Sequence, residues 1–420
     1  MAARSIGVVR ENLPNGLRVL IEPLSEFSSV SIGIWILNGS RDEEPAKAGI
    51  SHLIEHLSFK GTPTRGARQI ALEIDSLGGS LNAFTSKEYT SFYAKVLGNT
   101  LQDAMEILGD ITLNPLFQQA DLEKERDVII QEISMVEDTP EDLIHDLHSR
   151  EFWSGHGLGW PILGTQHSVM EMTAEDVHVF HRDRYRAGSM VITAAGAVEP
   201  EELLKEIRGT FGHLEKGDFH PARPVPDATP GTIVFNRPLE QVHFCVGFES
   251  MAVSDERRYH LYLLNTILGG GMSSRLFQRI REEMGLAYSV YSYHSAYQDA
   301  GLLTVYCGTS PDGFPTALDL VHEEINLLVQ EQVQEKALTT AKRQLKGNLL
   351  LSLESTGNRM NQLARNEIYF SRQIPPEEIE EGIESVTAGQ IQDLAGEIFN
   401  PEVRALSVIG PVNEDDLVDK

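Results

Sequence analysis

Two histidines and a glutamate lie within five residues, in the segment His52–His56, which reads His-Leu-Ile-Glu-His. On a helix, residues four apart are one turn apart on the same face, so both histidines would point the same way with Glu55 beside them. Two imidazoles and a neighbouring carboxylate suit a hydrolytic zinc site, with two metal ligands and one base that takes a proton from water. The alternative is a helix with two surface histidines and a solvated glutamate.

A third metal ligand is expected downstream. Asp121 is a suitable N-cap for a helical run that continues to Ile133. Within this run, Glu125 and Glu132 are seven apart, which is two turns and therefore one face. One carboxylate could bind the metal while the other orients a ligand from behind. Because the chain has 62 acidic residues, a solvated helix face is the alternative interpretation of this pair.

Several stretches together carry a family resemblance. The order His-x-x-Glu-His is the inverted form of the commoner zinc-protease motif. Three segments, His52–Thr62, Gly78–Ser86 and Glu125–Glu132, resemble the pitrilysin and mitochondrial processing peptidase family of zinc endopeptidases. The resemblance extends over nearly all 420 residues, so its motifs support one another.

The resemblance implies a role for each matched residue. Two histidines and a distal glutamate bind zinc in that family, which here gives His52, His56 and Glu132 as the ligands of one Zn²⁺ per chain. Glu55 would be the general base, and Glu125 would stand behind the metal. The implied activity is hydrolysis of peptides or unfolded segments in a closed chamber.

The net charge of the chain favours some classes of binding partner over others. With 35 basic and 62 acidic residues the net charge is −27, which argues against binding nucleic acid or an anionic membrane surface. It suits a site that attracts basic peptides, with solubility alone as the alternative use of the charge. The two cysteines, Cys245 and Cys307, lie in apolar strand-like runs and indicate small buried hydrophobes rather than a disulfide framework.

No targeting or membrane segment is evident. The first residues lack an apolar signal region, and no run of about 18 apolar residues occurs. We therefore expect a cytoplasmic protein, with a mature organellar protein that has lost its presequence as the alternative.

An internal repeat divides the chain. Thr173 opens a helix that leads to a strand and Gly196, and Thr387 does the same before Gly410, with equal separations (196 − 173 and 410 − 387 are both 23). This spacing indicates a duplicated domain, whose second copy is offset from the first by 214 residues (387 − 173), about half the chain. The sequence predicts a metal-bearing domain at residues 1–215, a Pro-rich linker at 216–231, and a homologous metal-free domain at 232–420.

Each half mixes strands and helices. The first half predicts a hairpin around Asn15-Gly16, strands at 29–36 and 89–96, and helices at 67–77, 100–112 and 121–152, the last bent near Pro140. Runs of strands and runs of helices favour an α+β class, with two domains that each have a mainly antiparallel sheet and helices packed on one face. The resemblance implies that the two domains form half of a clamshell.

The second half has no zinc motif. Its expected helix at 255–268 carries one histidine, His260, which we interpret as structural. The resemblance implies that Arg281 and Tyr288 contact substrate carbonyls and help to hold the tetrahedral intermediate. The alternative is that Arg281 is a solvated helix residue and that Tyr288 is the first residue of a strand. His145 and His148 resemble a metal pair, but we interpret them as surface residues on an acidic helix.

The segment Asn82-Ala83-Phe84-Thr85 is expected to form an edge strand near the zinc. A peptide could bind there as an added strand, held by main-chain hydrogen bonds that are largely independent of its sequence. Preference for particular side chains would then come from pockets elsewhere.

Three functions compete. The first is a zinc endopeptidase that acts on peptides or unfolded polypeptides. The second is one subunit of a heterodimeric processing peptidase, in which the zinc motif and the Arg/Tyr pair are divided between two chains. The third is a non-catalytic scaffold like the core proteins of respiratory complexes, which tend to lose zinc ligands. This chain has the ligands and also Arg281 and Tyr288, which favours a self-sufficient homodimer.

Overall fold

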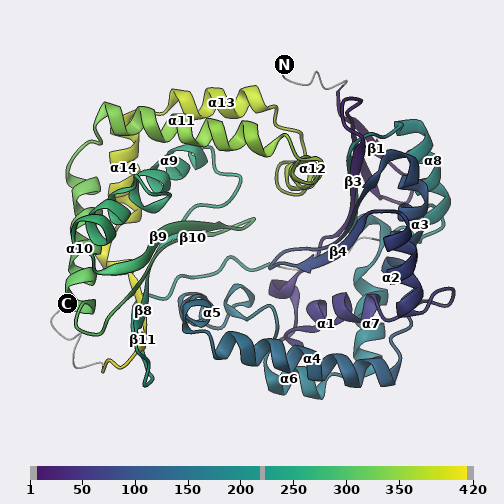
Figure 1. The fold of residues 1–420 in the computed structure, drawn as a ribbon, viewed down its shortest axis with the longest axis horizontal. Coiled ribbons are helices and arrows are strands. Elements are labelled where there is room, and N and C mark those ends of the chain that lie inside the picture. The colour runs from purple at the N-terminus through teal and green to yellow at the C-terminus, as the bar shows by residue number, and fades with distance from the viewer. Residues whose placement is uncertain (1–6, 218–222, 414–420) are drawn as a thin grey trace. The chain divides into compact units, whose positions relative to one another are not determined.

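The computed structural model describes residues 7–217 and 223–413, which fold as two compact units (Figure 1). The first unit contains the segments up to residue 134, 160–223 and 352–373. The second contains the segments 135–159, 224–351 and 374 onwards. The predicted division at 1–215, 216–231 and 232–420 therefore differs from the units at two segments, 135–159 and 352–373. Residues 218–222 of the predicted linker lie outside the described residues.

The first unit is built on a six-stranded sheet. Its spatial order is β1 (Val9–Asn12), β2 (Arg18–Pro23), β6 (Met190–Gly196), β3 (Ser29–Ile36), β5 (Thr90–Leu97) and β4 (Ser80–Thr85). Only the β2–β6 pair is parallel. The predicted hairpin joins β1 to β2, and Gly16 has the positive φ of 97° that such a turn requires. The strand expected at 82–85 is confirmed as the last part of an edge strand, β4.

Most helices of this unit cover one face of its sheet. They are α1 (Ile50–Ser58), α2 (Ala67–Ser76), α3 (Leu101–Leu113), α4 (Gln119–Glu137), α6 (Gln166–Glu171), α7 (Ala174–Arg184) and α8 (Pro200–Phe211). Their apolar residues share one core with alternate residues of β3, namely Val30, Ile32, Ile34 and Ile36.

The single bent helix predicted at 121–152 is wrong. The chain instead forms α4 and a separate helix, α5 (Pro140–Phe152). Thr139 is extended, and Pro140 occupies the first turn, where its missing N–H costs no hydrogen bond. Pro140 therefore starts a helix rather than bending one.

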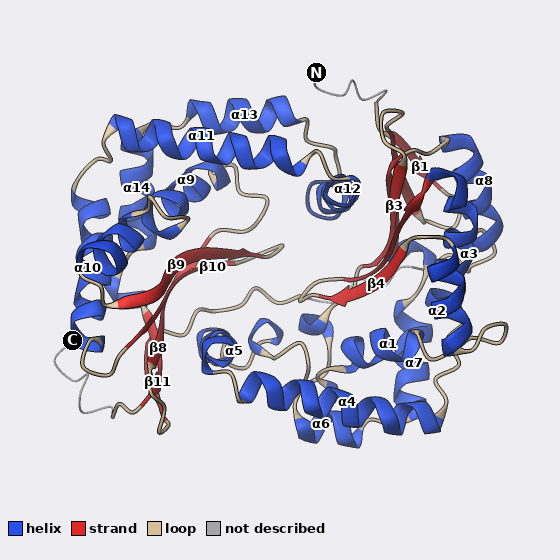
Figure 2. Ribbon diagram, viewed as in Figure 1, coloured by secondary structure: helices blue, strands red, loops and turns tan. Residues whose placement is uncertain are grey.

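The second unit repeats this plan. Its five-stranded sheet has the order β7 (Gly231–Asn236), β11 (Ala405–Gly410), β8 (Val242–Ser250), β10 (Gly301–Thr309) and β9 (Ala287–Ala296), with β7–β11 parallel. One face packs on α9 (Arg258–Gly269), α10 (Phe314–Gln330), α11 (Glu335–Ser352), α13 (Pro376–Ser385) and α14 (Ala388–Ile398). Figure 2 shows the strands of each unit gathered in a sheet with helices beside it.

The repeat inferred from Thr173 and Thr387 is present in the structure. Both side chains cap their helices, accepting from the backbone N–H of Asp176 and Gln390 respectively. The strands that follow, β6 and β11, each pair in parallel with an earlier strand of their own unit. The sequence repeat therefore marks equivalent elements.

Helices cover the second face of each sheet as well, because the halves of the chain exchange one helix. The helix α12 (Thr356–Phe370) packs on β6 and β3 of the first unit through Met360, Leu363 and Ala364. In the equivalent place, α5 packs on β11 and β8 of the second unit. The expectation of helices on one face only is corrected accordingly.

Close backbone approach permits both contacts. A Cβ on Gly33 would lie 3.1 Å from Met360 Sδ, and one on Gly247 would lie 2.2 Å from His148 Nε2. These two glycines are separated by the same offset as the repeated threonines (247 − 33 equals 387 − 173). The duplicated fold therefore keeps a glycine at one equivalent position beneath each exchanged helix.

Two further expectations concern burial. Cys245 on β8 and Cys307 on β10 are both buried, as predicted. Among the described residues, no helix combines the length and the apolar character needed to cross a bilayer.

Candidate metal centre

The helix α1 presents the motif because its ends and its buried face are fixed. Leu53, Ile54 and Leu57 are buried in the core, so the histidines lie on the face that remains accessible. Glycine precedes the helix: Gly49 has φ 94°, a left-handed conformation that a side chain would strain.

A buried carboxylate caps this helix. Glu43 Oε2 accepts from Gly49 N at 2.7 Å, and Glu43 Oε1 accepts from Ser51 N at 2.9 Å. A carboxylate at a helix N-terminus satisfies free N–H groups and interacts favourably with the helix dipole. Burial raises the pKa of Glu43 to about 7, and the hydrogen bonds from Ser51 and Gly49 oppose this rise.

The helix α4 supplies the carboxylates. Leu122, Glu125, Ile129 and Ile133 form its buried stripe, and Glu132 is half-buried beside it. The two glutamates share one face of α4, and Glu125 lies deeper among the packed residues than Glu132.

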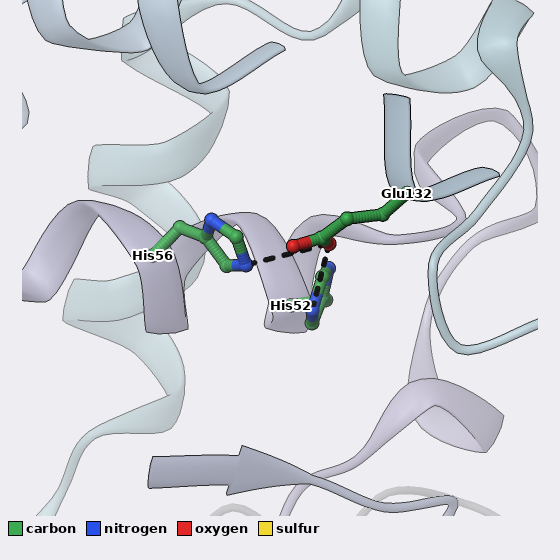
Figure 3. A group of neighbouring side chains, drawn as sticks. All are labelled: His52, His56 and Glu132. Atoms are coloured by element: carbon green, nitrogen blue, oxygen red, sulfur yellow. Dashed lines mark ion pairs between the residues drawn. The ribbon is translucent and has the colours of Figure 1, made fainter. Parts of the chain in front are cut away.

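His52, His56 and Glu132 converge (Figure 3). Glu132 Oε2 lies 3.8 Å from His52 Nε2 and 3.6 Å from His56 Nε2. One ligand atom from each residue lies within 4.8 Å of the others, a geometry found for no other group of three such residues in the described chain. Two imidazoles and a carboxylate match the donor set of hydrolytic zinc sites.

Glu125 orients the ring of His56 through the nitrogen that does not face Glu132. His56 Nδ1 lies 3.1 Å from Glu125 Oε2, which leaves Nε2 directed at Glu132. Lys60 Nζ lies 2.7 Å from the other oxygen, Glu125 Oε1, and compensates the charge of this buried carboxylate. Such a partner fixes the tautomer and ring direction of a metal-binding histidine.

Burial favours the neutral form of His52. It lowers the pKa of His52 to about 4, and the charge of neighbouring His56 acts in the same direction. Burial also raises the pKa of Glu55, against the hydrogen bond from Thr85 and the charge of His56. A neutral imidazole is the form that binds a metal ion, and a carboxylate with a raised pKa is a stronger base.

Glu55 is held by the predicted substrate strand. Thr85 Oγ1 donates to Glu55 Oε2 at 2.6 Å. Of the other strand residues, Asn82 is exposed, Ala83 is buried and Phe84 is half-buried. The structure thus brings the end of β4 to the motif, as expected from the sequence.

Arg281 and Tyr288 lie in the second unit, on a π-helix (Phe277–Glu283) and on β9. Arg281 Nη1 donates to Tyr288 O at 2.9 Å, and its guanidinium is 4.6 Å from the centre of the Tyr288 ring. The Tyr288 side chain is 81% exposed. The two residues therefore form a local pair, and their contact with substrate stays a prediction.

The interpretation of His145 and His148 as surface residues is wrong. His148 is fully buried with Nδ1 2.9 Å from Ser407 Oγ, and His145 lies between the hydroxyls of Tyr293, at 2.8 Å, and Tyr291, at 3.1 Å. Both histidines belong to α5. This helix packs against strands that are distant in the sequence, and the local sequence pattern does not indicate that contact.

Sequence reasoning missed three contributors: the helix cap Glu43, the cation Lys60, and the hydroxyl of Thr85. Lys60 is four positions beyond His56, a spacing that suggests a place near the metal ligand. Glu43 and Thr85 act across loops and strands, and no local spacing signals their contacts.

Comparisons with known proteins find matching family models and relatives that are named zinc proteases. A family model described as "Insulinase (Peptidase family M16)" matches residues 18–166, which include every residue of the candidate centre. A second model, "Peptidase M16 inactive domain", matches residues 171–345. In Bacillus subtilis, the "Uncharacterized zinc protease YmxG" is 39% identical over 96% of this chain and 98% of the relative. An "Uncharacterized zinc protease" of Rickettsia felis is 39% identical over 95% and 96%.

Solved structures share the fold. A protease from Helicobacter pylori superposes with a TM-score of 0.91, covering 97% of this chain and 100% of the other at 20% identity. A Pseudomonas fluorescens structure titled "peptidase M16 inactive domain" gives a TM-score of 0.90 at 20% identity, over 97% and 98%. Both structures support the two-unit α+β architecture.

Proposed function

This chain belongs to peptidase family M16, and from that premise we propose that it is a zinc-dependent endopeptidase that hydrolyses peptides or unfolded segments. The observation that carries the proposal is the convergence of His52, His56 and Glu132, with Glu55 on the same helix. Its relatives are named zinc proteases, which supports the same metal.

The residues fit zinc. Their donor set is two imidazole nitrogens and one carboxylate, and Glu125 already directs His56 Nε2 towards Glu132. His52, His56 and Glu132 would hold one Zn²⁺. Bound zinc would polarise the scissile carbonyl and make a water molecule more acidic.

The chain's own residues do the remaining work. Glu55 would accept the proton of the attacking water and return it to the leaving amine. The free edge of β4 would hold the substrate backbone as an added strand. Arg281 and Tyr288 would donate hydrogen bonds to substrate carbonyls and to the developing oxyanion.

The oligomeric state and the cellular location are further parts of the proposal. We propose a homodimer that encloses a chamber, in the cytoplasm. The alternatives are a subunit of a heterodimeric processing peptidase and a non-catalytic scaffold. The complete ligand set argues against the scaffold. The "inactive domain" match, at 171–345, lies outside the zinc motif.

A digestion experiment tests the function. The purified protein is incubated with a mixture of unfolded peptides, with and without a chelator, and the products are identified by mass spectrometry. We expect chelator-sensitive internal cleavage, and a kcat lower by roughly 10²–10⁴ in Glu55→Gln at unchanged zinc content, since water would bind without its base. Absence of cleavage by zinc-loaded protein would refute the proposal, and wild-type turnover in Glu55→Gln would remove Glu55 from the role of base.

A further inference from the structure

We infer that Thr85 is a positioning residue: its hydroxyl fixes the Glu55 carboxylate and links the substrate-binding strand to the general base. The inference rests on the proposed function. The sequence suggests only a main-chain role for Thr85, as the last residue of β4. Its side chain adds a direct contact to the base.

The contact is short and selective for one carboxylate oxygen. Thr85 Oγ1 lies 2.6 Å from Glu55 Oε2, within the range of a hydroxyl hydrogen bond to an ionised acceptor. Among the described residues, Glu55 Oε1 accepts no hydrogen bond, and it is not enclosed by protein. One oxygen is thus held while the other remains available for a proton.

The backbone of Thr85 is held by the β4–β5 hairpin. Thr85 pairs with Thr90 in the antiparallel register. In the turn that follows, Ser86 N and Ser86 Oγ both donate to Tyr89 O, at 2.9 and 2.8 Å. Tyr89 N donates back to Ser86 Oγ at 3.2 Å. The hydroxyl of Thr85 therefore projects from a closed, hydrogen-bonded turn.

The neighbouring residue anchors the strand from its other face. The Phe84 ring lies 5.8 Å from the Trp35 ring and 6.1 Å from the rings of Tyr89 and Tyr93, edge-on in each case. Trp35 Nε1 donates to Thr193 Oγ1 at 2.8 Å. This packing restrains sliding of β4, which would carry Thr85 away from Glu55.

The same helix exchange that builds the unit supports this anchor. Thr193 Oγ1 donates at 3.1 Å to the carbonyl of Met360, on α12. Met360 packs in the cluster that contains Trp35 and Tyr89. A continuous set of contacts therefore runs from the exchanged helix through the aromatic cluster to β4 and the base.

Two roles are combined in one strand. If a peptide binds along the free edge of β4, its register is set relative to the strand that also holds Glu55. The distance between the scissile carbonyl and the base then depends on a single rigid element. Loss of the Thr85 hydroxyl should loosen the base without weakening substrate binding, so kcat should fall while KM stays constant.

Kinetics of matched variants test this. For Thr85→Val we expect a kcat roughly 10–100-fold lower and a KM within about twofold of wild type. Thr85→Ser retains a hydroxyl, so its kcat should be within about threefold of wild type. Thr90→Val is the control, since Thr90 Oγ1 donates to Asn38 O at 3.2 Å in the same hairpin and does not contact Glu55.

A stability cycle tests the contact without catalysis. Thr85→Val should lower Tm by about 3 °C in wild type and by about 1 °C in the Glu55→Gln background, because the charged acceptor is already gone. Zinc content should be equal in all variants. Additive Tm shifts, or equal kcat for Thr85→Val and Thr90→Val, would overturn the inference. If wild type lacks chelator-sensitive cleavage, the proposed function fails instead, and the cycle still decides the contact.

Discussion

The two units repeat the same elements but differ sharply at the place where the metal centre lies. The helix α4 carries Glu125 and Glu132, and its equivalent in the second unit is α11, which starts close to one repeat offset later. The only acid of α11 is Glu335, and its charged residues are otherwise basic: Lys336, Lys342, Arg343 and Lys346. In α9, the counterpart of α1, a single histidine occurs and no carboxylate. Duplication thus preserved the framework, and a few side chains decide which copy can bind a metal.

A second contrast lies beneath the exchanged helices. In the first unit, Thr193 donates to the backbone of α12, which packs through aromatic and aliphatic residues and also forms the ion pairs Arg359–Glu22 and Glu367–Arg10 with its sheet. In the second unit, Ser407 takes the equivalent position, one repeat offset after Thr193 (407 − 193 equals 387 − 173), and its Oγ lies 2.9 Å from Nδ1 of His148 on α5. The docking position and the apolar packing are retained, while the polar contacts differ: ion pairs accompany α12, and histidine contacts with tyrosine and serine hydroxyls accompany α5. The fold therefore specifies where these helices bind and leaves their side chains free to vary.

Removing a metal ligand should have the largest effect on this contrast. We expect about one zinc per chain in wild type and nearly none in His52→Ala, with loss of peptide cleavage, because two ligands rarely retain zinc. His260→Ala, on α9, is the matched control and should keep its metal. Elemental analysis after gel filtration measures both. Equal zinc in the two variants would show that the metal binds elsewhere.

Changing the residues behind the metal should have an intermediate effect. Glu125→Gln and Lys60→Met each disturb the group that orients His56, so zinc affinity should fall roughly 10–100-fold. Lys346→Met provides the control on α11, because it removes an ion pair to Glu384 that has no counterpart at the metal centre. Competition with a chromophoric chelator reports the affinity. Unchanged zinc affinity in Glu125→Gln would show that Glu125 does not orient His56 for metal binding.

Local signals in the sequence account for the parts of the structure that are local. The strand predicted at 29–36 is β3, and the helix predicted at 67–77 ends one position earlier, at Ser76. Alternation in β3 and helical spacing in α2 are determined by neighbours in the chain. The convergence of Glu132 with the histidines is different, because several strands and helices separate them in the chain. Its prediction required the family resemblance as well as spacing.

The features that sequence reasoning did not foresee depend on contacts across the chain. The exchange of α5 and α12 is invisible in either helix, because each has an ordinary amphipathic pattern whichever sheet it covers. Burial of His148 follows from that exchange. The contact between Thr85 and Glu55 joins an edge strand to a helix, and neither residue type predicts this contact.

The smallest predicted effect concerns pH and again compares the exchanged helices. Burial, followed by the charge of His145, lowers the pKa of His148 to about 3, below its ordinary value of 6.5. The unfolded chain therefore binds a proton that the folded chain excludes. Stability from this residue is complete above about pH 6.5 and is lost as pH falls towards 3. At pH 5.5 the loss should reach about 1.4 kcal/mol.

Amide hydrogen exchange of α5 and of α12 measures how the stability of each helix depends on pH. After correction for intrinsic rates, protection of α5 should fall between pH 7.5 and 5.5, since His148 has no described partner at Nε2 to stabilise a proton. His145 on the same helix and His243 on β8 also have lowered pKa values, owing to burial, and act in the same direction. The described contacts of α12 with its sheet involve no histidine, and burial raises the pKa of Glu22, the ion-pair partner of Arg359 on α12, so the protection of α12 should not fall over this range. His148→Gln should remove much of the pH response of α5. Equal responses of the two helices would mean that their docking chemistry differs in composition but not in energetics.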